Sequence, residues 1–148
     1  MRATVDSNIL IYSVDPNDRI KQSVAIDIVR RLALGGSPLA EQCVFEFLHA
    51  TTRKLRVPLT LAVGSVAAWT ATFAITLATP NTLGTTLQLL GQYKLSVWDA
   101  RLLAICHGDG IEVLLTEDLQ DGGKYGTVTV LNPFNAANAG SINALLPP

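Results

Sequence analysis

The spacing of apolar positions divides the chain into short strands that alternate with longer helices. Val24, Ile28 and Leu32 recur at helical spacing, which predicts an amphipathic helix. The predicted helices are Asn8–Val14, Lys21–Leu34, Gln42–Lys54, Thr60–Thr72, one beginning at Asn81 or Thr82, and one that Ser96 opens and Gly108 and Gly110 end. The predicted strands are Arg2–Val5, Ser37–Ala40, Ala74–Leu77, Glu112–Leu115 and Thr127–Leu131. This order predicts an α/β fold with a mostly parallel sheet of about five strands and helices on both faces.

The length of 148 residues and the apolar share of 49% fit one domain. We place this domain in residues 1–134. The remaining segment, 135–148, is rich in Asn, Ala and Gly and ends in Pro-Pro. Such a composition predicts a flexible C-terminal tail.

The charge balance disfavours a passive nucleic-acid-binding protein, which normally carries a basic excess. Eleven basic and twelve acidic residues give a net charge of -1, so contact with phosphate would need a local basic patch or a metal ion. Cys43 and Cys106 lie in apolar runs, which indicates buried free thiols and a reducing compartment. No apolar run of signal-peptide length follows the N-terminus. We therefore expect a cytoplasmic protein.

The stretch Val57–Tyr93 carries no charged residue. Its first part is apolar enough to suggest a membrane span, but its threonines, the Gly64-Ser65 pair and Pro80 argue against one. We expect no membrane association, and we expect a partner to cover part of this surface.

Several acidic residues follow predicted strands. Asp6 follows the first strand directly, and Glu117, Asp118 and Asp121 follow the strand that ends at Leu115. In parallel sheets, ligands collect beyond the carboxyl ends of the strands. The alternatives are a helix N-cap for Asp6 and a solvated turn for the other three acids.

Two further acids lie on predicted helices. Asp99 shares a stripe with Leu102, Leu103 and Cys106, where an unpaired carboxylate is costly; the alternative is a capping box with Ser96. Glu46 shares a face with His49 and Arg53, which is either a solvated face or the wall of an active site.

Acids from distant segments that met at one sheet edge would repel each other unless a divalent cation lay among them. Oxygen ligands favour Mg²⁺ or Mn²⁺. We expect no zinc site, because His49 and His107 are not spaced as a zinc pair and we place neither cysteine among the acids. The phosphate-binding and nucleophile-elbow motifs of other hydrolases are absent from the sequence.

Five motifs resemble those of the PIN-domain ribonucleases, and most of all the VapC-like toxins of type II toxin–antitoxin systems. They are VDSNILIY at 5–12, EFLHATTRK at 46–54, LSVWDARLLA at 95–104, LLTEDLQDG at 114–122 and LNPF at 131–134. The resemblance implies a three-layer α/β/α sandwich. It also implies an endoribonuclease that depends on Mg²⁺ or Mn²⁺ and hydrolyses RNA phosphodiester bonds with metal-activated water.

The resemblance assigns roles by position. Asp6, Glu46 and Asp99 match the three core acids. Asp118 is the favoured fourth acid, and Asp121 is a possible additional metal ligand. Asn8 and Thr116 would orient the acids by hydrogen bonds. Ser7 departs from the commoner Thr but keeps the hydroxyl.

The implied partners are an RNA substrate, a cognate antitoxin and a second copy of the chain. Arg53, Lys54 and Arg56 could steer RNA, or they could simply complement the dipole at a helix end. The Val57–Tyr93 stretch is the candidate contact for the dimer or the antitoxin. Two other functions stay open: a catalytically silent PIN-like module that binds RNA or protein, and a metal-dependent phosphatase or DNA nuclease.

Overall fold

Three parallel strands form the centre of the structure, a computed structural model that describes residues 1–148. They are β1 (Ala3–Val5), β4 (Val113–Leu115) and β6 (Val128–Leu131), and β5 (Lys124–Tyr125) adds an antiparallel edge, in the order β1-β4-β6-β5. A separate parallel pair, β2 (Leu39–Ala40) and β3 (Ile75–Thr76), lies beside β1. The mostly parallel sheet is confirmed. The main sheet has four strands instead of about five because β2 and β3 pair only with each other.

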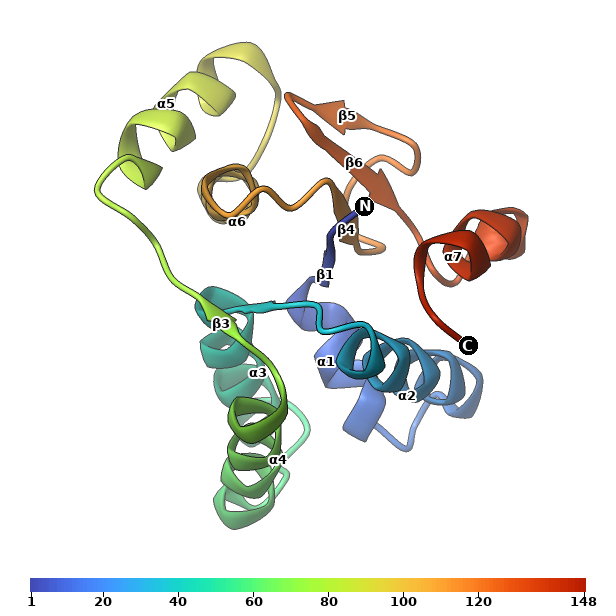
Figure 1. The fold of residues 1–148 in the computed structure, drawn as a ribbon. Helices are drawn as coiled ribbons and strands as arrows, with labels where there is room; N and C mark the ends of the chain where they lie inside the picture. The colour runs from blue at the N-terminus through green and yellow to red at the C-terminus, as the bar shows by residue number, and fades with distance from the viewer.

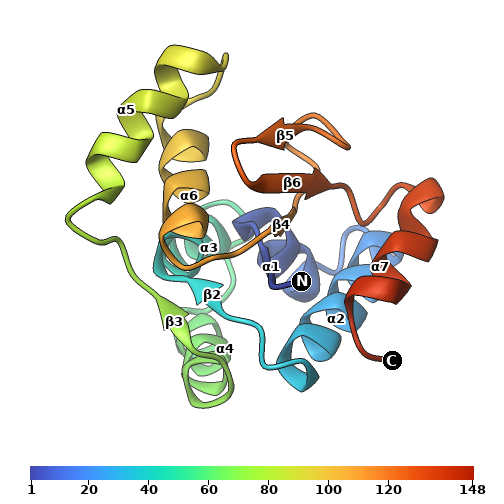
Figure 2. The same ribbon diagram turned by 45° about the horizontal axis from the view of Figure 1, so that its top comes forward.

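Seven α-helices flank these strands. They are α1 (Ser7–Val14), α2 (Arg19–Leu34), α3 (Glu41–Arg53), α4 (Leu59–Thr72), α5 (Thr82–Gln92), α6 (Val97–Gly108) and α7 (Ala139–Leu145). Figures 1 and 2 show α5 and α6 on one side of the main sheet and α2 and α7 on the other, as expected for a three-layer α/β/α sandwich. No helix combines the length and the apolarity that a membrane span requires.

The strand register aligns the residues at the carboxyl edge of the sheet. Val5 pairs with Leu115, and Leu115 pairs with Leu131. The ladder continues one step further, because the Asp6 N–H donates to the Leu115 carbonyl at 3.0 Å and the Thr116 N–H donates to the Leu131 carbonyl at 3.1 Å. Asp6 and Thr116 therefore leave adjacent strands at the same level.

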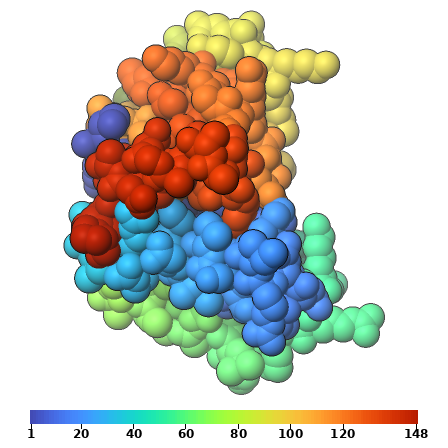
Figure 3. Space-filling model, turned by 90° about the vertical axis from the view of Figure 1, so that its right-hand side faces the viewer, coloured from blue at the N-terminus to red at the C-terminus, as the bar shows by residue number.

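The C-terminal segment is helical and packs against the domain. A 3₁₀ turn, η1 (Ala136–Asn138), leads into α7, and Figure 3 shows this segment lying across α2. The buried Arg31 guanidinium donates to the carbonyls of Leu146 and Pro147 at 2.9 and 2.8 Å. The sequence predicts a flexible tail at 135–148. The structure instead shows α7 in this segment, with the carbonyls that follow the helix bound by the positively charged Arg31 side chain.

Candidate functional site

Asp6 lies at the centre of the site and is almost fully buried, with 6% of its surface exposed. It caps α1, accepting the Ser7 N–H at 2.6 Å, and its other oxygen accepts the Thr116 hydroxyl at 2.8 Å. Burial raises the pKa of Asp6 to about 6, and the negative charges of Glu46 and Asp118 act in the same direction, against the two hydrogen bonds. Asp6 is therefore both the N-cap of α1 and a member of the acidic group, because its capping position also brings it close to Glu46 and Asp118.

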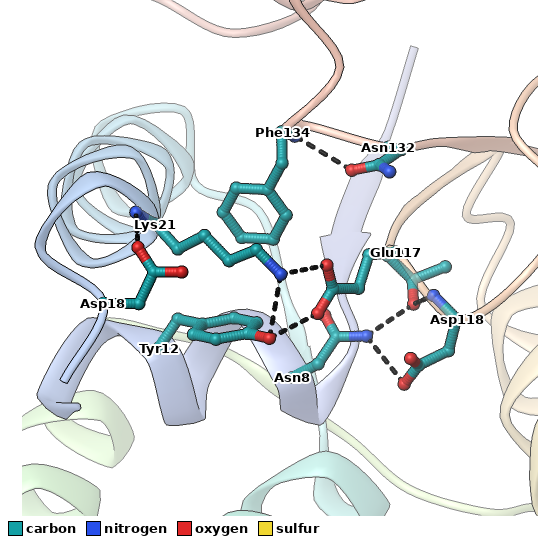
Figure 4. Close-up of polar contacts among 9 residues, drawn as sticks. Asn8, Tyr12, Asp18, Lys21, Glu117, Asp118, Asn132 and Phe134 are labelled. Carbon is teal, nitrogen blue, oxygen red and sulfur yellow. Dashed lines mark hydrogen bonds and ion pairs between the residues drawn. The ribbon is translucent and has the colours of Figure 1, made fainter.

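Thr116 links Asp6 to the loop that follows β4. Its fully buried hydroxyl donates to Asp6 and accepts from the Asn8 side-chain amide at 2.8 Å and the Asp118 N–H at 3.1 Å. The Asn8 amide also donates to the Asp118 carboxylate at 2.9 Å, as Figure 4 shows. These bonds fix the direction of the Thr116 proton and hold Asp6 and Asp118 in a single network. Thr116 thus contacts both acids and Asn8 contacts the Asp118 carboxylate, as a positioning role requires.

Glu46 approaches Asp6 from α3. Ligand atoms of Asp6, Cys43 and Glu46 all lie within 4.8 Å of one another. The Gln42 side chain, one helical turn before Glu46, donates to its carboxylate at 2.9 Å and to the Trp98 carbonyl at 3.0 Å. Gln42 therefore joins α3 to the start of α6 beside the acids.

A groove of about 830 Å³ runs along these acids. Its lining includes Glu46, Asp118 and Asn8, and the aromatic side chains of Phe45 and Trp98, which are 64% and 63% exposed. His49, Lys54 and Arg101 also line it. The groove thus combines carboxylates, exposed aromatic faces and cationic side chains, which is a suitable composition for an unpaired nucleotide strand.

Asp99 lies in the first turn of α6, directly after Trp98, and its carboxylate faces Ser96. The Ser96 hydroxyl accepts the Asp99 N–H at 3.0 Å and donates to the Asp99 carboxylate at 2.7 Å. Ser96 therefore caps α6, as one half of the capping box requires, but the Asp99 carboxylate accepts from the Ser96 hydroxyl and not from its backbone N–H. Asp99 is not among the residues that line the groove, so its place among the core acids stays a prediction.

Asp118 and Asp121 share a loop but have different surroundings. Asp118 is exposed and lines the groove. Asp121 accepts from the Asn132 backbone and from the side chains of Asn135 and Asn138, so both of its oxygens are occupied. These hydrogen bonds hold the pKa of Asp121 below its usual value, the bond from Asn132 being the strongest influence. The structure places Asp118, and not Asp121, in the groove, close enough to Asp6 for its charge to raise the Asp6 pKa.

A second polar cluster supports the same loop from the side of α2. The Lys21 ammonium lies 2.6 Å from the Glu117 carboxylate and 3.0 Å from the Tyr12 hydroxyl, which itself donates to Glu117 (Figure 4). Lys21 also lies over the rings of Tyr12 and Phe134. The hydrogen bond to Glu117 raises the pKa of both Lys21 and Tyr12. Glu117, which the sequence groups with the other loop acids, therefore forms an ion pair with Lys21.

Only one member of the basic cluster reaches the groove. Lys54 lines it, whereas Arg53 and Arg56 are exposed elsewhere. The sequence analysis missed five residues of the site: Gln42, Cys43, Phe45, Trp98 and Arg101. Arg101 lines the groove and donates to the Gln42 side chain at 2.6 Å, and nothing in its sequence context indicates this position. Cys43 could have been found, because it precedes Glu46 by three residues and so shares its helix face. The expectation that neither cysteine lies among the acids is therefore wrong for Cys43.

The donor set suits a hard divalent cation. Asp6 and Glu46 supply carboxylate oxygens near one another, and the negative charges of Glu46 and Asp118 raise the Asp6 pKa. A divalent cation would offset this repulsion and the cost of burying the Asp6 charge. Mg²⁺ and Mn²⁺ both favour oxygen ligands. Asp6, Glu46 and Asp118 are therefore the residues that could hold one.

Comparison with known proteins identifies the fold. No family model matches the chain, and no curated protein matches it in sequence. Among solved structures, VapBC2 from Rickettsia felis, bound to a DNA fragment from its promoter, matches with a TM-score of 0.68 at 9% identity, over 89% of this chain and 98% of that one.

Two more solved structures agree. A toxin–antitoxin complex from Klebsiella pneumoniae matches with a TM-score of 0.62 at 20% identity, over 89% of this chain and 98% of that one. VapC20 from Mycobacterium tuberculosis, a toxin that cleaves the sarcin–ricin loop, matches with a TM-score of 0.59 at 18% identity, over 78% of this chain and 91% of that one. At these identities the likeness concerns the fold.

Proposed function

We propose that this chain, which has the fold of the VapC-type PIN toxins, is a metal-dependent endoribonuclease and the toxin of a toxin–antitoxin pair. One observation carries the proposal: the buried Asp6 carboxylate, hydrogen-bonded by Thr116, lies beside Glu46 at the edge of a groove that Asp118 and two exposed aromatic side chains also line. The VapC20 toxin, with the same fold, cleaves the sarcin–ricin loop, an RNA.

Asp6, Glu46 and Asp118 would hold Mg²⁺ or Mn²⁺, and Asp99 remains a predicted fourth acid. When bound, such a cation lowers the pKa of water and stabilises negative charge on a phosphodiester. Thr116 and Asn8 keep the Asp6 and Asp118 oxygens directed by hydrogen bonds. Phe45 and Trp98 offer faces on which bases stack, and Lys54 and Arg101 offer positive charge to the backbone.

Total cellular RNA tests this proposal directly. The purified protein is incubated with Mg²⁺, with Mn²⁺ or with EDTA, and Asp6→Ala and Asp99→Ala are assayed in parallel. We expect discrete fragments that require the cation and disappear in Asp6→Ala. Retention of cleavage by Asp99→Ala would remove Asp99 from the core acids.

The same assay separates the other activities. Intact RNA in the presence of cation, with no antitoxin copurified, would favour a silent binding module. Preferential cleavage of DNA, or release of phosphate from a phosphomonoester, would favour the DNA nuclease or the phosphatase.

Two partners follow from the proposal: a cognate antitoxin and a second copy of the chain. The uncharged stretch forms α4, β3 and α5. Six of its large apolar side chains are exposed: Leu59, Leu61, Val63, Leu77, Leu83 and Leu87. Exposed apolar side chains of this kind fit a contact with another protein. Sedimentation velocity of wild type and Leu83→Glu tests the dimer: we expect a dimer that the charge converts to monomer, and a wild-type monomer would contradict it.

A further inference from the structure

Arg101 is a positively charged residue that lies among acids and pairs with none of them. It lines the groove together with Glu41, Glu46 and Asp118. It forms no ion pair with these or with any other carboxylate. Its hydrogen-bond partner is the neutral side chain of Gln42, whose carbonyl oxygen accepts from the guanidinium at 2.6 Å. The positive charge of Arg101 is therefore not compensated by any direct contact.

Gln42 fixes the direction in which the Arg101 side chain is held. The Gln42 side chain is buried, and its amide nitrogen donates to the Glu46 carboxylate at 2.9 Å and to the Trp98 carbonyl at 3.0 Å. A reversed amide would bring oxygen against both of these acceptors and nitrogen against the guanidinium, so the three contacts agree on one orientation. Gln42 therefore holds Arg101 at one end of its amide and Glu46 at the other.

The Arg101 guanidinium has donors left for a ligand. An arginine side chain carries several N–H donors in one plane, and such a planar fork matches two oxygens of a phosphate. Trp98 precedes Arg101 by three residues on α6, so both side chains lie on one face of the helix, and both line the groove. This face of α6 therefore offers a ring for a base and a guanidinium for a phosphate, which are the two parts of one nucleotide.

Lys54 provides a contrast within the groove. It lies exposed at the C-terminal end of α3, whereas Arg101 is half-buried and held by Gln42. A donor that is fixed before the reaction needs no reorganisation when negative charge develops on a phosphate. An exposed cation contributes mainly to the attraction of the strand. We therefore expect Lys54 to act on RNA binding alone and Arg101 to act on the cleavage step.

We propose that Arg101 contacts the RNA phosphate at the position of cleavage and that Gln42 is the residue that positions it. This inference rests on the proposed function, because it takes the RNA strand to lie in the groove beside the acids. The guanidinium donates to two non-bridging oxygens of the phosphate and offsets their repulsion by the carboxylates. The contact transfers no proton and forms no covalent bond. It stabilises the negative charge that develops while the phosphorus–oxygen bond to the leaving group breaks.

Cleavage of one RNA substrate by full-length variants, with Mg²⁺ in excess, tests the role of Arg101. Arg101→Gln should lower kcat about 100-fold, as the loss of one fixed donor to a developing charge does. Arg101→Lys keeps the charge without the planar fork and should remain about 10-fold below the wild type. Arg53→Gln is the matched control, because Arg53 is exposed outside the groove, and its kcat should stay within about 2-fold of the wild type.

The positioning role of Gln42 is tested by Gln42→Met, which keeps the length of the side chain and removes the amide. Alone, this change should lower kcat about 10-fold, as loss of a residue that orients another does. In the Arg101→Gln background it should change kcat by less than about 3-fold, because its effect passes through Arg101. The same loss in both backgrounds would show that Gln42 acts through Glu46 instead, and would remove the positioning role.

RNA binding without cleavage separates the phosphate contact from a purely structural role of Arg101. Fluorescence anisotropy in EDTA, at several salt concentrations, measures the affinity for a labelled decauridylate. Arg101→Gln should weaken the logarithmic salt dependence of binding by about 0.7, the value for one phosphate contact with a single strand. If Arg101 only joins α3 to α6, the same variant will unfold at lower urea concentration and keep the salt dependence of the wild type.

The two measurements also distinguish this inference from the nuclease. A wild type that binds RNA without cleaving it, together with a weaker salt dependence in Arg101→Gln, would reject the nuclease and retain the phosphate contact. Cleavage by the wild type with unchanged kcat and salt dependence in Arg101→Gln would do the reverse. If Arg101→Gln does not fold, Arg101→Lys decides, and a kcat equal to that of the wild type overturns the inference. A wild type that neither binds nor cleaves RNA overturns both.

Discussion

Asp6 and Asp121 lie at the same edge of the sheet and have opposite surroundings. Asp6 is buried beside other carboxylates, and its pKa is raised to about 6 by that burial. Asp121 is exposed, binds amide donors through both oxygens, and has a lowered pKa because those hydrogen bonds favour the ionised form. The fold therefore surrounds Asp6 with further negative charge, whereas it supplies Asp121 with hydrogen-bond donors for both of its oxygens.

The difference separates a functional acid from a structural one. A carboxylate that burial and charge make costly to ionise is a common feature of binding and catalytic sites. Asp121 accepts four hydrogen bonds, two on each oxygen, which occupy the roughly four acceptor positions of a carboxylate, whereas the Asp6 oxygen that faces Thr116 accepts only one. Asp121 instead ties the loop after β4 to Asn132, Asn135 and Asn138, where the C-terminal segment begins. The comparison predicts that substitutions at the two positions act on different properties.

The largest expected effect is on RNA cleavage. Asp6→Asn should lower kcat/KM by at least about 100-fold. Loss of a residue that only hydrogen-bonds to a metal ligand costs up to about 100-fold, and loss of the ligand itself should cost at least as much. Asp121→Asn keeps the size of the side chain and should retain cleavage within about 3-fold, because its oxygens are bound outside the groove. Initial rates on one RNA substrate, with Mg²⁺ in excess, measure both variants. Equal losses in the two variants would remove the distinction between these acids.

The next effect is on stability as a function of pH. Because the folded-state pKa of Asp6 lies above its ordinary value of 3.8, this group disfavours folding once it ionises, and the penalty is complete above about pH 6. Without cation, Asp6→Asn should therefore be more stable than wild type by about 1–3 kcal/mol at pH 8. The advantage should shrink as the pH falls from about 6 to about 4.

Urea unfolding in EDTA at several pH values measures this difference, and comparison with wild type cancels the contributions of all other groups. Addition of Mn²⁺ is the control. A cation that binds the folded state stabilises it by about 2.7 kcal/mol at 100 times its Kd, and only the wild type should gain this. A pH-independent difference would mean that burial does not penalise the Asp6 charge.

Asp121 should show the opposite pH dependence and a smaller effect. Its folded-state pKa is lowered, so its contribution to stability is present above the ordinary carboxyl range and is lost as the pH falls through the folded pKa. Asp121→Asn should cost about 1 kcal/mol at pH 7, a typical value for hydrogen bonds at an exposed site. The cost should fall toward zero in acid. Urea unfolding at pH 7 and pH 3 measures it, and an equal cost at both values would contradict the assignment.

The sequence predicts the parts of this molecule that depend on local pattern. Apolar periodicity locates the three parallel strands of the main sheet, and the residues that follow them give Asp6 and Asp118 their place at the sheet edge. The same pattern does not show which acid is satisfied. Asp121 is distinguished by the Asn132 backbone N–H and the side chains of Asn135 and Asn138, which reach it only because of how the chain turns after β6.

Contacts between distant segments, and one strand too short to show a pattern, explain the other differences. The segment 135–148 has the composition of a tail, but it is helical in the structure, and the buried Arg31 binds its last carbonyls from α2. β5 is two residues long and pairs with β6 through a short hairpin, which leaves too little sequence for a periodic signal. Arg101 reaches the groove through Gln42 on another helix.

The smallest effect concerns the basic residues at the end of α3. Lys54 lines the groove and Arg56 does not, although the two are close in sequence. Lys54→Ala should raise KM for RNA about 2- to 5-fold with kcat unchanged, because it removes one contact with the backbone and leaves the acids in place. The salt dependence of 1/KM should also weaken by about 0.7 in logarithmic slope, the value for one contact with a single strand. Arg56→Ala is the matched control and should match the wild type in both measurements; if it weakens KM as much as Lys54→Ala does, the RNA path extends beyond the groove.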